Sequence, residues 1–108
     1  MTLRIAIAGT GSMAAMHARA IRAQPGVELS AAAGHTPERL RKFAAEFNIP
    51  RAYESLDDLI AMRAADALVI ATPNFLHAPQ AILALREGLH VLIERPLGLD
   101  LAQARAIE

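Results

Sequence analysis

The feature that most constrains the fold is a glycine-rich turn placed directly after a short apolar strand. Residues 3–8 form a nearly continuous apolar run with two isoleucines, and Gly9-Thr10-Gly11 follows at once. Such a run is typical of a strand buried in a parallel sheet, and glycine permits a tight turn at its end. A helical period begins after the turn, so the chain is expected to open with a strand, a glycine turn and a helix.

Strands and helices alternate along the rest of the chain. The first helix is expected over 13–24, with Ser12 as its cap, Pro25-Gly26 as its end, and apolar residues at roughly helical spacing, namely Met13, Met16, Ala20, Ile21 and Ala23. Pro37 favours the start of a second helix, and Ser55 indicates the start of a third. Later strands are predicted over 27–33, near 52–53, over 67–71 and over 90–93, and later helices over 37–47, 56–62, 78–87 and from 100 onward.

This alternation predicts a doubly wound α/β fold with a mostly parallel sheet of about five strands. A right-handed crossover returns each helix to the sheet, so helices cover both faces. No internal repeat or linker interrupts the pattern, and 108 residues suit one domain over 1–108. We therefore expect a single doubly wound α/β domain.

Composition excludes several kinds of partner. The 11 Lys and Arg residues balance the 11 Asp and Glu residues, and the formal net charge is +0. Nucleic acids and anionic membranes are held chiefly by clustered cations, so neither is an expected partner. The longest charge-free stretch, residues 67–85, is interrupted by prolines and polar residues and is a poor membrane span.

The absence of cysteine also limits the chemistry. With Cys 0 the chain has no disulfide, thiol nucleophile or thiolate metal site, which suits a reducing compartment. The N-terminal apolar run is too short for a secretory signal. We expect a cytoplasmic protein.

The glycine turn matches a known ligand pattern. Gly9-Thr10-Gly11-Ser12-Met13-Ala14 fits G-x-G-x-x-G/A at a helix start. In that context the first glycine makes the turn, the second admits a pyrophosphate, and the small last residue lets helix and strand pack closely. The helix N-terminus would hold the phosphates. The alternative is an ordinary glycine turn in an α/β domain.

The end of the second strand bears on which dinucleotide binds. NAD-binding proteins usually keep an acid there for the ribose 2′-hydroxyl. This chain has Gly34-His35-Thr36 instead, with Glu38 and Arg39 one turn later. His35, Thr36 and Arg39 could donate to a 2′-phosphate, which predicts NADP over NAD. The alternative is NAD held less tightly, with Glu38 at the ribose diol.

A third loop lies at the same edge of the sheet. Thr72-Pro73-Asn74 and His77 follow the fourth strand, and ligands of open α/β sheets bind at the carboxyl ends of strands. His77 is a candidate catalytic residue that could face cofactor or substrate, or else a local helix cap. His17 and His90 are interpreted as structural. The four histidines lack carboxylates at metal-ligand spacing, so no metal site is expected.

Glu94-Arg95-Pro96 follows the fifth strand and completes a wider match. In order and spacing the chain resembles, along its whole length, the N-terminal domain of the Gfo/Idh/MocA family, which includes glucose-fructose oxidoreductase and inositol dehydrogenase. The segments that carry the resemblance are residues 9–14, 18–28, 36–39, 72–74 with His77, and 88–96.

The resemblance implies an oxidoreductase that moves hydride to or from C–OH groups of sugars or cyclitols, with Glu94, Arg95 and Pro96 beside the nicotinamide cofactor. The family usually has Glu-Lys-Pro here, so Arg95 replaces a lysine that helps to position substrate and nicotinamide. A guanidinium stays charged at any physiological pH. Arg95 is therefore a candidate catalytic residue that orients or stabilises an oxyanion and does not serve as a general base.

The resemblance also implies a missing partner. Family members have a Rossmann fold that continues through a sixth strand into a larger domain with the substrate site. We therefore expect this chain to lack that strand and that domain, and to be inactive or nearly so as it stands. Two other interpretations stay open: a non-catalytic nucleotide-sensing or interaction module on the same fold, and an enzyme completed by a separately encoded chain. The apolar strand 91–93 would be an exposed sheet edge, which predicts self-association into a homo-oligomer.

Overall fold

A computed structural model describes residues 2–93, apart from the side chain of Asn74. Glu94, Arg95, Pro96 and the helix expected from residue 100 lie outside the described residues. Between residues 2 and 93, no helix is long and apolar enough to cross a membrane.

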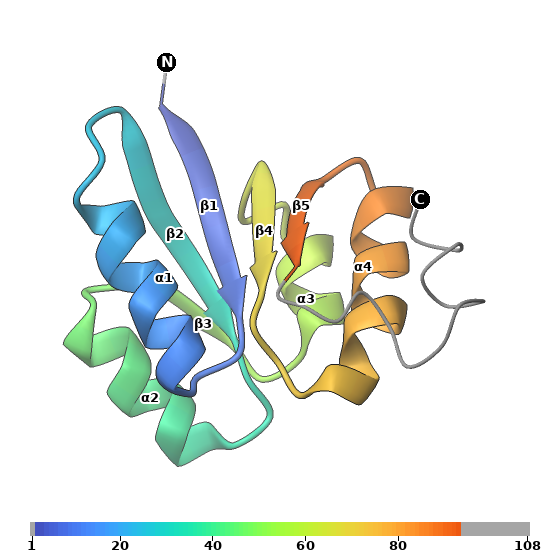
Figure 1. The fold of residues 1–108 in the computed structure, drawn as a ribbon, viewed down its shortest axis with the longest axis horizontal. Helices are drawn as coiled ribbons and strands as arrows, with labels where there is room; N and C mark the ends of the chain where they lie inside the picture. The colour runs from blue at the N-terminus through green and yellow to red at the C-terminus, as the bar shows by residue number, and fades with distance from the viewer. Residues whose placement is uncertain (1, 94–108) are drawn as a thin grey trace.

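The described residues form one five-stranded sheet in the order β3-β2-β1-β4-β5 (Figure 1). Every neighbouring pair of strands is parallel. The strands are β1 (Leu3–Ala8), β2 (Val27–Ala33), β3 (Arg51–Tyr53), β4 (Ala67–Ile70) and β5 (His90–Ile93). The helices are α1 (Ser12–Arg22), α2 (Pro37–Glu46), α3 (Leu56–Ala61), α4 (His77–Arg86) and a 3₁₀ turn, η1 (Asn74–Leu76). The predicted α/β fold with a parallel sheet is confirmed.

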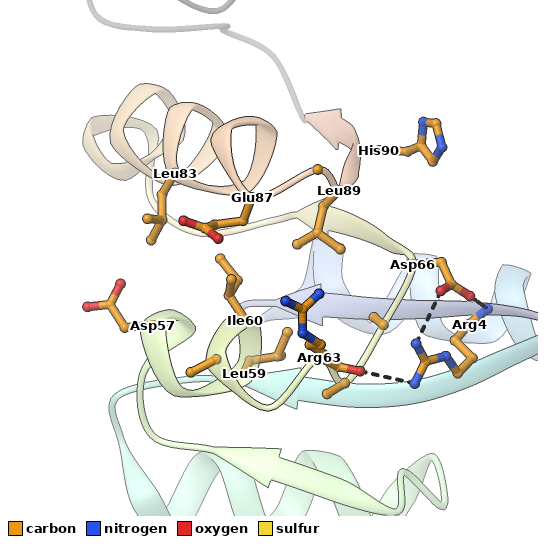
Figure 2. Close-up of a pocket in the computed structure, with 14 residues that line it drawn as sticks. Arg4, Asp57, Leu59, Ile60, Arg63, Asp66, Leu83, Glu87, Leu89 and His90 are labelled. Atoms are coloured by element: carbon orange, nitrogen blue, oxygen red, sulfur yellow. Dashed lines mark hydrogen bonds and ion pairs between the residues drawn. The ribbon is translucent and has the colours of Figure 1, made fainter.

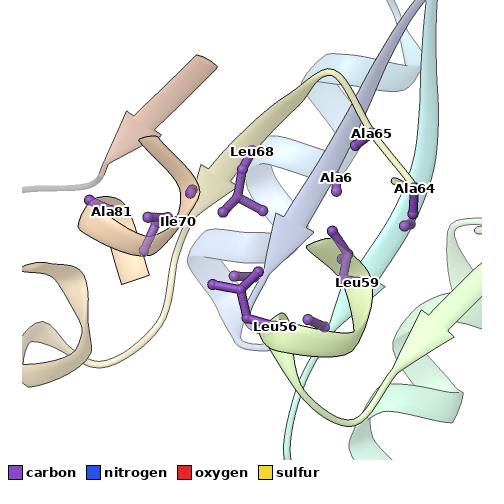
Figure 3. Packing of buried hydrophobic residues seen from close by; sticks show 12 residues of the cluster. Ala6, Leu56, Leu59, Ala64, Ala65, Leu68, Ile70 and Ala81 are labelled. Carbon is purple, nitrogen blue, oxygen red and sulfur yellow. The ribbon is translucent and has the colours of Figure 1, made fainter. Parts of the chain in front are cut away.

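Two apolar clusters cover the two faces of the sheet. In β1, Ala6 and Ala8 pack with α3 and α4, while Ile7 packs with α1 and α2. Because side chains alternate along a strand, a continuous apolar run fills both clusters. Figure 3 shows that the α3 side is built largely from alanines and leucines, among them Ala6, Leu56 and Leu59. Small side chains on this face let the short helix α3 approach the sheet closely.

A bulge in β2 adjusts which side chains face which cluster. Pairing with β1 shifts between Ile5 and Ala6, so that Leu29 and Ala31 stand opposite consecutive residues. Leu29 belongs to the cluster on the α1 side and Ala31 to the cluster on the α3 side, although they are two positions apart. Ser30 is the extra residue, and its buried hydroxyl donates to the Ala64 carbonyl at 2.7 Å.

The start and the buried face of α1 differ from the sequence-based expectation. Gly11 is the N-cap and Ser12 is already helical, so the expected Ser12 cap is wrong and no side chain caps this helix. The residues that α1 buries are Ala14, Ala18 and Ile21. Met13 and Met16, part of the apolar pattern, are 43% and 47% exposed. Small residues face the sheet here because the helix begins immediately after the tight glycine turn.

Other helix signals agree with the structure. Pro37 occupies the first turn of α2, and Ser55 caps α3 by accepting a hydrogen bond from the Asp58 N–H at 3.1 Å. The turn η1 precedes α4 and was not expected. Its Leu76 N–H donates to the Pro73 carbonyl at 2.9 Å, so the loop after β4 is shorter than the sequence suggested.

Candidate functional site

A groove of about 350 Å³ lies at the carboxyl ends of β1, β2 and β4. In sheets with this strand order, ligands bind in the crevice outside the carboxyl ends of the strands. The groove brings together three segments that are far apart in the sequence. Its lining residues are Gly9, Thr10, Gly11, Ser12, Met13, Gly34, His35, Thr36, Arg39, Ala71, Thr72 and Pro73.

Gly9 joins the ends of β1 and β4. Its φ is +120°, a backbone conformation that side-chain-bearing residues rarely adopt. A Cβ at this position would stand 2.5 Å from the carbonyl oxygen of Ala71. The Gly9 N–H donates to the Ala33 carbonyl at 2.9 Å, which also ties the turn to the end of β2. Glycine is therefore required for the close approach of these strand ends.

Gly11 has the opposite environment. A Cβ at Gly11 would meet nothing within 4 Å, so the backbone at the start of α1 faces open space. The first-turn N–H groups of an α-helix have no partner within the helix and can bind an anion. Ala14, the last residue of the glycine pattern, is 0% exposed and packs beneath the turn. An exposed helix N-terminus with room for a second group fits a bound pyrophosphate.

The end of β2 forms the second wall of the groove. Gly34, His35, Thr36 and Arg39 line it, whereas the nearby Glu38 does not. The Gly34 N–H donates to the Tyr53 carbonyl at 3.0 Å, which anchors this segment to β3. Among residues 2–93, those that line the groove include no carboxylate. Arg39 brings a positive charge to the same wall.

The loop after β4 is held from behind by His77. This residue is 1% exposed, and its Nε2 lies 2.7 Å from the Thr72 carbonyl oxygen. Because that oxygen only accepts, Nε2 carries the proton and donates it. The Thr72 hydroxyl donates to Oε1 of Gln80 at 2.5 Å. His77 thus lies beneath the groove and fixes Thr72, which is on its surface.

A second hollow, of about 650 Å³, lies between α3 and α4, where residues at the starts of β1, β4 and β5 also line it. Figure 2 shows Leu83 and Leu89 on one side of the hollow and Ile60 on the other, with an ion pair at one end. No strand contributes its carboxyl end to this hollow. The glycine turn and the wall at the end of β2 are absent from it, so the smaller groove is the better candidate site.

The ion pair beside this hollow joins Arg4 to Asp66. The Arg4 Nη2 lies 3.1 Å from Oδ1 of Asp66, and the Arg4 backbone N–H donates to Oδ2 at 3.0 Å. These hydrogen bonds hold the pKa of Asp66 below its ordinary value of 3.8, and the bond from the guanidinium has the largest effect. The second Arg4 nitrogen, Nη1, donates to the Arg63 carbonyl at 3.1 Å. Both charged side chains are exposed, so the pair stabilises the fold only weakly.

The remaining candidates stand as follows. His17 is half-buried on α1, and His90 is exposed at the start of β5. Within residues 2–93, no group of His, Asp and Glu side chains is arranged to hold a metal ion.

Ala71 lines the groove but was not predicted from the sequence, because only its backbone matters and an alanine carries no signal. Likewise nothing in the sequence pointed to the hollow between α3 and α4.

Comparison with known proteins places these features in a family. A model of an oxidoreductase family with an NAD-binding Rossmann fold, Gfo/Idh/MocA, matches residues 3–108. Among curated relatives, 4-carboxy-2-hydroxymuconate-6-semialdehyde dehydrogenase of Sphingobium sp. is 31% identical over 105 residues, covering 97% of this chain and 33% of that protein. The NADP(+)-dependent scyllo-inositol 2-dehydrogenase of Bacillus subtilis is 35% identical over 94 residues, covering 87% of this chain and 29% of that protein.

A solved structure agrees with these relatives. The WlbA dehydrogenase of Bordetella pertussis, in complex with NADH and UDP-GlcNAcA, superposes with a TM-score of 0.94 at 32% identity. The match covers 99% of this chain and 33% of that one. The chain therefore spans about a third of the length of the proteins it matches.

Proposed function

This chain belongs to the Gfo/Idh/MocA oxidoreductase family, whose Rossmann fold binds NAD, and we propose that its groove binds NADP in preference to NAD. The observation that carries the proposal is the wall at the end of β2. His35, Thr36 and Arg39 line that wall, and none of the described residues that line the groove carries a carboxylate. A 2′-phosphate there would meet hydrogen-bond donors and a positive charge without repulsion from an acid.

The rest of the groove supports a dinucleotide with its pyrophosphate at α1. Gly11 leaves open space beside the backbone, and the N-terminus of α1 supplies N–H groups and the positive end of the helix dipole. Ser12 and Met13 line the same space. On the far side Thr72, Pro73 and Asn74 follow β4 and would flank the nicotinamide half of the cofactor.

For the whole enzyme we propose hydride transfer to or from a C–OH group of a sugar or cyclitol. A bound nicotinamide would supply or accept the hydride. The support comes from relatives: the name of one specifies scyllo-inositol, and a solved neighbour contains UDP-GlcNAcA. Hydride transfer requires a substrate held against the nicotinamide, so we propose that the part of the enzyme beyond this domain supplies the substrate site.

Glu94, Arg95 and Pro96 remain proposed cofactor contacts, outside the described residues. Arg95 would orient the substrate or stabilise an oxyanion, because a guanidinium does not release its proton. His77 is better suited to positioning, since its buried ring donates to the Thr72 carbonyl. A general base for the reaction would then come from elsewhere in the enzyme.

A non-catalytic nucleotide-sensing module is the second candidate function. Arg95 favours it, because this residue stands where the family usually has lysine. A module of this kind would still bind a dinucleotide in the same groove but would need no substrate domain. For either function, we also propose a cytoplasmic location and association of copies through β5.

Thermal unfolding of the 108-residue chain tests the proposed function. A ligand at ~100 times its dissociation constant stabilises the folded state by about 2.7 kcal/mol. We expect a larger rise in Tm with saturating NADP than with saturating NAD. Preference for NAD would overturn the interpretation of the β2 wall alone, and no rise with either cofactor would overturn the dinucleotide site.

Gly11→Val is the matched variant for this experiment. Nothing stands within 4 Å of its Cβ, so we expect the ligand-free Tm to change by less than about 3 °C. The branched side chain would fill the space proposed for the pyrophosphate, so NADP should no longer raise the Tm. An undiminished rise would mean that the phosphates lie elsewhere.

A further inference from the structure

A side chain at position 34, at the end of β2, would collide with the glycine turn. A Cβ built on Gly34 would lie 2.9 Å from the methyl carbon, Cγ2, of Thr10. Real Cβ atoms essentially never come so close to another heavy atom, so one of the two groups must shift. The next neighbour, Cδ1 of Leu40, is at an ordinary contact distance of 3.7 Å.

The backbone does not itself require glycine at this position. The glycines with positive φ among the described residues are Gly9, Gly26 and Gly88, and Gly34 is not one of them. The φ of Gly34 therefore lies outside the left-handed range that favours glycine. A side chain at position 34 would instead collide with the Thr10 methyl group. This collision, and not the backbone conformation, is what favours glycine there.

Thr10 has few ways to move aside. Its Cβ carries a methyl and a hydroxyl, so two of its three staggered positions are always filled. Only one rotamer would leave the space beside Gly34 empty. A serine has a single heavy atom on Cβ, which leaves that space empty in two rotamers of three. The obstacle is therefore the branching of Thr10 rather than its polarity.

We propose that Thr10 and Gly34 form a steric pair that determines cofactor preference. The Thr10 methyl occupies the volume that a side chain at position 34 would need, which keeps a carboxylate from the end of β2. The side chains at this wall of the groove are then those of His35, Thr36 and Arg39. This inference rests on the proposed function for its consequence, but the steric coupling can be tested without any cofactor.

The first experiment is a double-mutant cycle on the Tm of the ligand-free chain. Gly34→Ala should lower the Tm by roughly 5 °C, because overpacking outweighs the gain from a less flexible unfolded chain. With Thr10→Ser present, Gly34→Ala should leave the Tm unchanged or raise it. Thr10→Val is the matched control: it keeps the branching and loses the hydroxyl, so Gly34→Ala should remain destabilising there. Equal effects of Gly34→Ala in the parent chain and in the Thr10→Ser variant would overturn the steric pair.

The second experiment measures dissociation constants for NAD and NADP by calorimetry. Gly34→Asp should lower NADP affinity at least about tenfold in both backgrounds, through repulsion between the carboxylate and the 2′-phosphate. NAD affinity should rise by about tenfold only when Thr10→Ser is also present, since the carboxylate then reaches the ribose diol without displacing the turn. An equal gain with Thr10 retained would overturn the proposed control of cofactor preference. If the parent chain binds neither cofactor, the proposed function fails, and the Tm cycle still decides the steric coupling.

Discussion

The space around two glycines, Gly9 and Gly11, determines the shape of the groove. At Gly9 the carbonyl of Ala71 excludes a side chain, and at Gly11 open space would admit one. Glycine thus serves two purposes in one short motif. Gly9 allows the ends of β1 and β4 to approach each other closely, and Gly11 leaves room for a ligand.

Gly9→Ala should therefore destabilise far more than another glycine substitution at positive φ. Gly26 has φ +77° and nothing within 4 Å of its Cβ, so Gly26→Ala should cost only the conformational strain of ~1–2 kcal/mol. Gly9→Ala adds the 2.5 Å approach to the Ala71 carbonyl oxygen, which should raise the loss of unfolding free energy to more than about 3 kcal/mol. Urea denaturation of both variants measures the difference. Equal losses would show that Gly9 is required for its backbone conformation alone.

The Arg4–Asp66 pair makes a small contribution to stability that depends on pH. The folded-state pKa of Asp66 lies below its ordinary value of 3.8, so the folded protein favours the ionised carboxylate. The contribution is complete well above that ordinary value and disappears as the pH falls through the lower folded-state pKa. Asp66→Asn should therefore slightly lower stability at pH 7, and it should lower it less at pH 2. Urea unfolding at both pH values checks this, and a difference that grows toward pH 2 would contradict it.

At the scale of elements, the glycine turn decides which face of α1 is buried. Periodicity alone grouped Met13 and Met16 with Ile21, yet Ala14 and Ala18 pack on the sheet beside Ile21. A helix that starts directly after a tight turn comes too close to the sheet for large side chains. Hydrophobic periodicity located the helix correctly, but the choice between two apolar faces depended on a distance that no sequence pattern reports.

The loop between β4 and α4 depends on the buried His77. His77→Ala removes the hydrogen bond to the Thr72 carbonyl and leaves space in a buried site, so unfolding free energy should fall by about 2–4 kcal/mol. Because Thr72 lines the groove, NADP affinity should fall as well. Urea unfolding and a cofactor titration measure the two effects.

His90→Ala is the control for this variant. Its side chain is exposed at the start of β5, so both quantities should stay within about 0.5 kcal/mol of the parent values. Unchanged ligand-free stability in His77→Ala would argue that the ring does not hold the loop and would restore its candidacy for a direct chemical role.

For the whole molecule, the order of elements and the ligand edge of the sheet followed from the sequence. Alternation of apolar strands with capped helices is a local property, and parallel strands bring their carboxyl ends to one edge. The β2 bulge at Ser30 and the position of the Thr10 methyl group beside Gly34 could not be predicted. Both depend on how neighbouring strands meet in space. Nor does any sequence signal mark the hollow between α3 and α4.

The edge strand β5 predicts association between copies of this chain. It stands last in the strand order, and its Leu92 is 57% exposed. Leu92→Lys should reduce association, because charge on an edge strand opposes pairing with another chain. Met62, which is 60% exposed just after α3, gives the matched control Met62→Lys. Light scattering over a concentration series measures the mass, and a parent chain that stays monomeric throughout would refute this prediction.

The central claim is the location of the dinucleotide in the groove at the carboxyl ends of β1, β2 and β4. The most direct test is amide NMR of the ¹⁵N-labelled chain during titration with NADP. We predict the largest shift changes at residues 9–13, 34–36 and 72, with little change at Ile60, Leu83 and Leu89 in the hollow between α3 and α4. Shift changes centred on that hollow, or no changes at saturating NADP, would contradict the account.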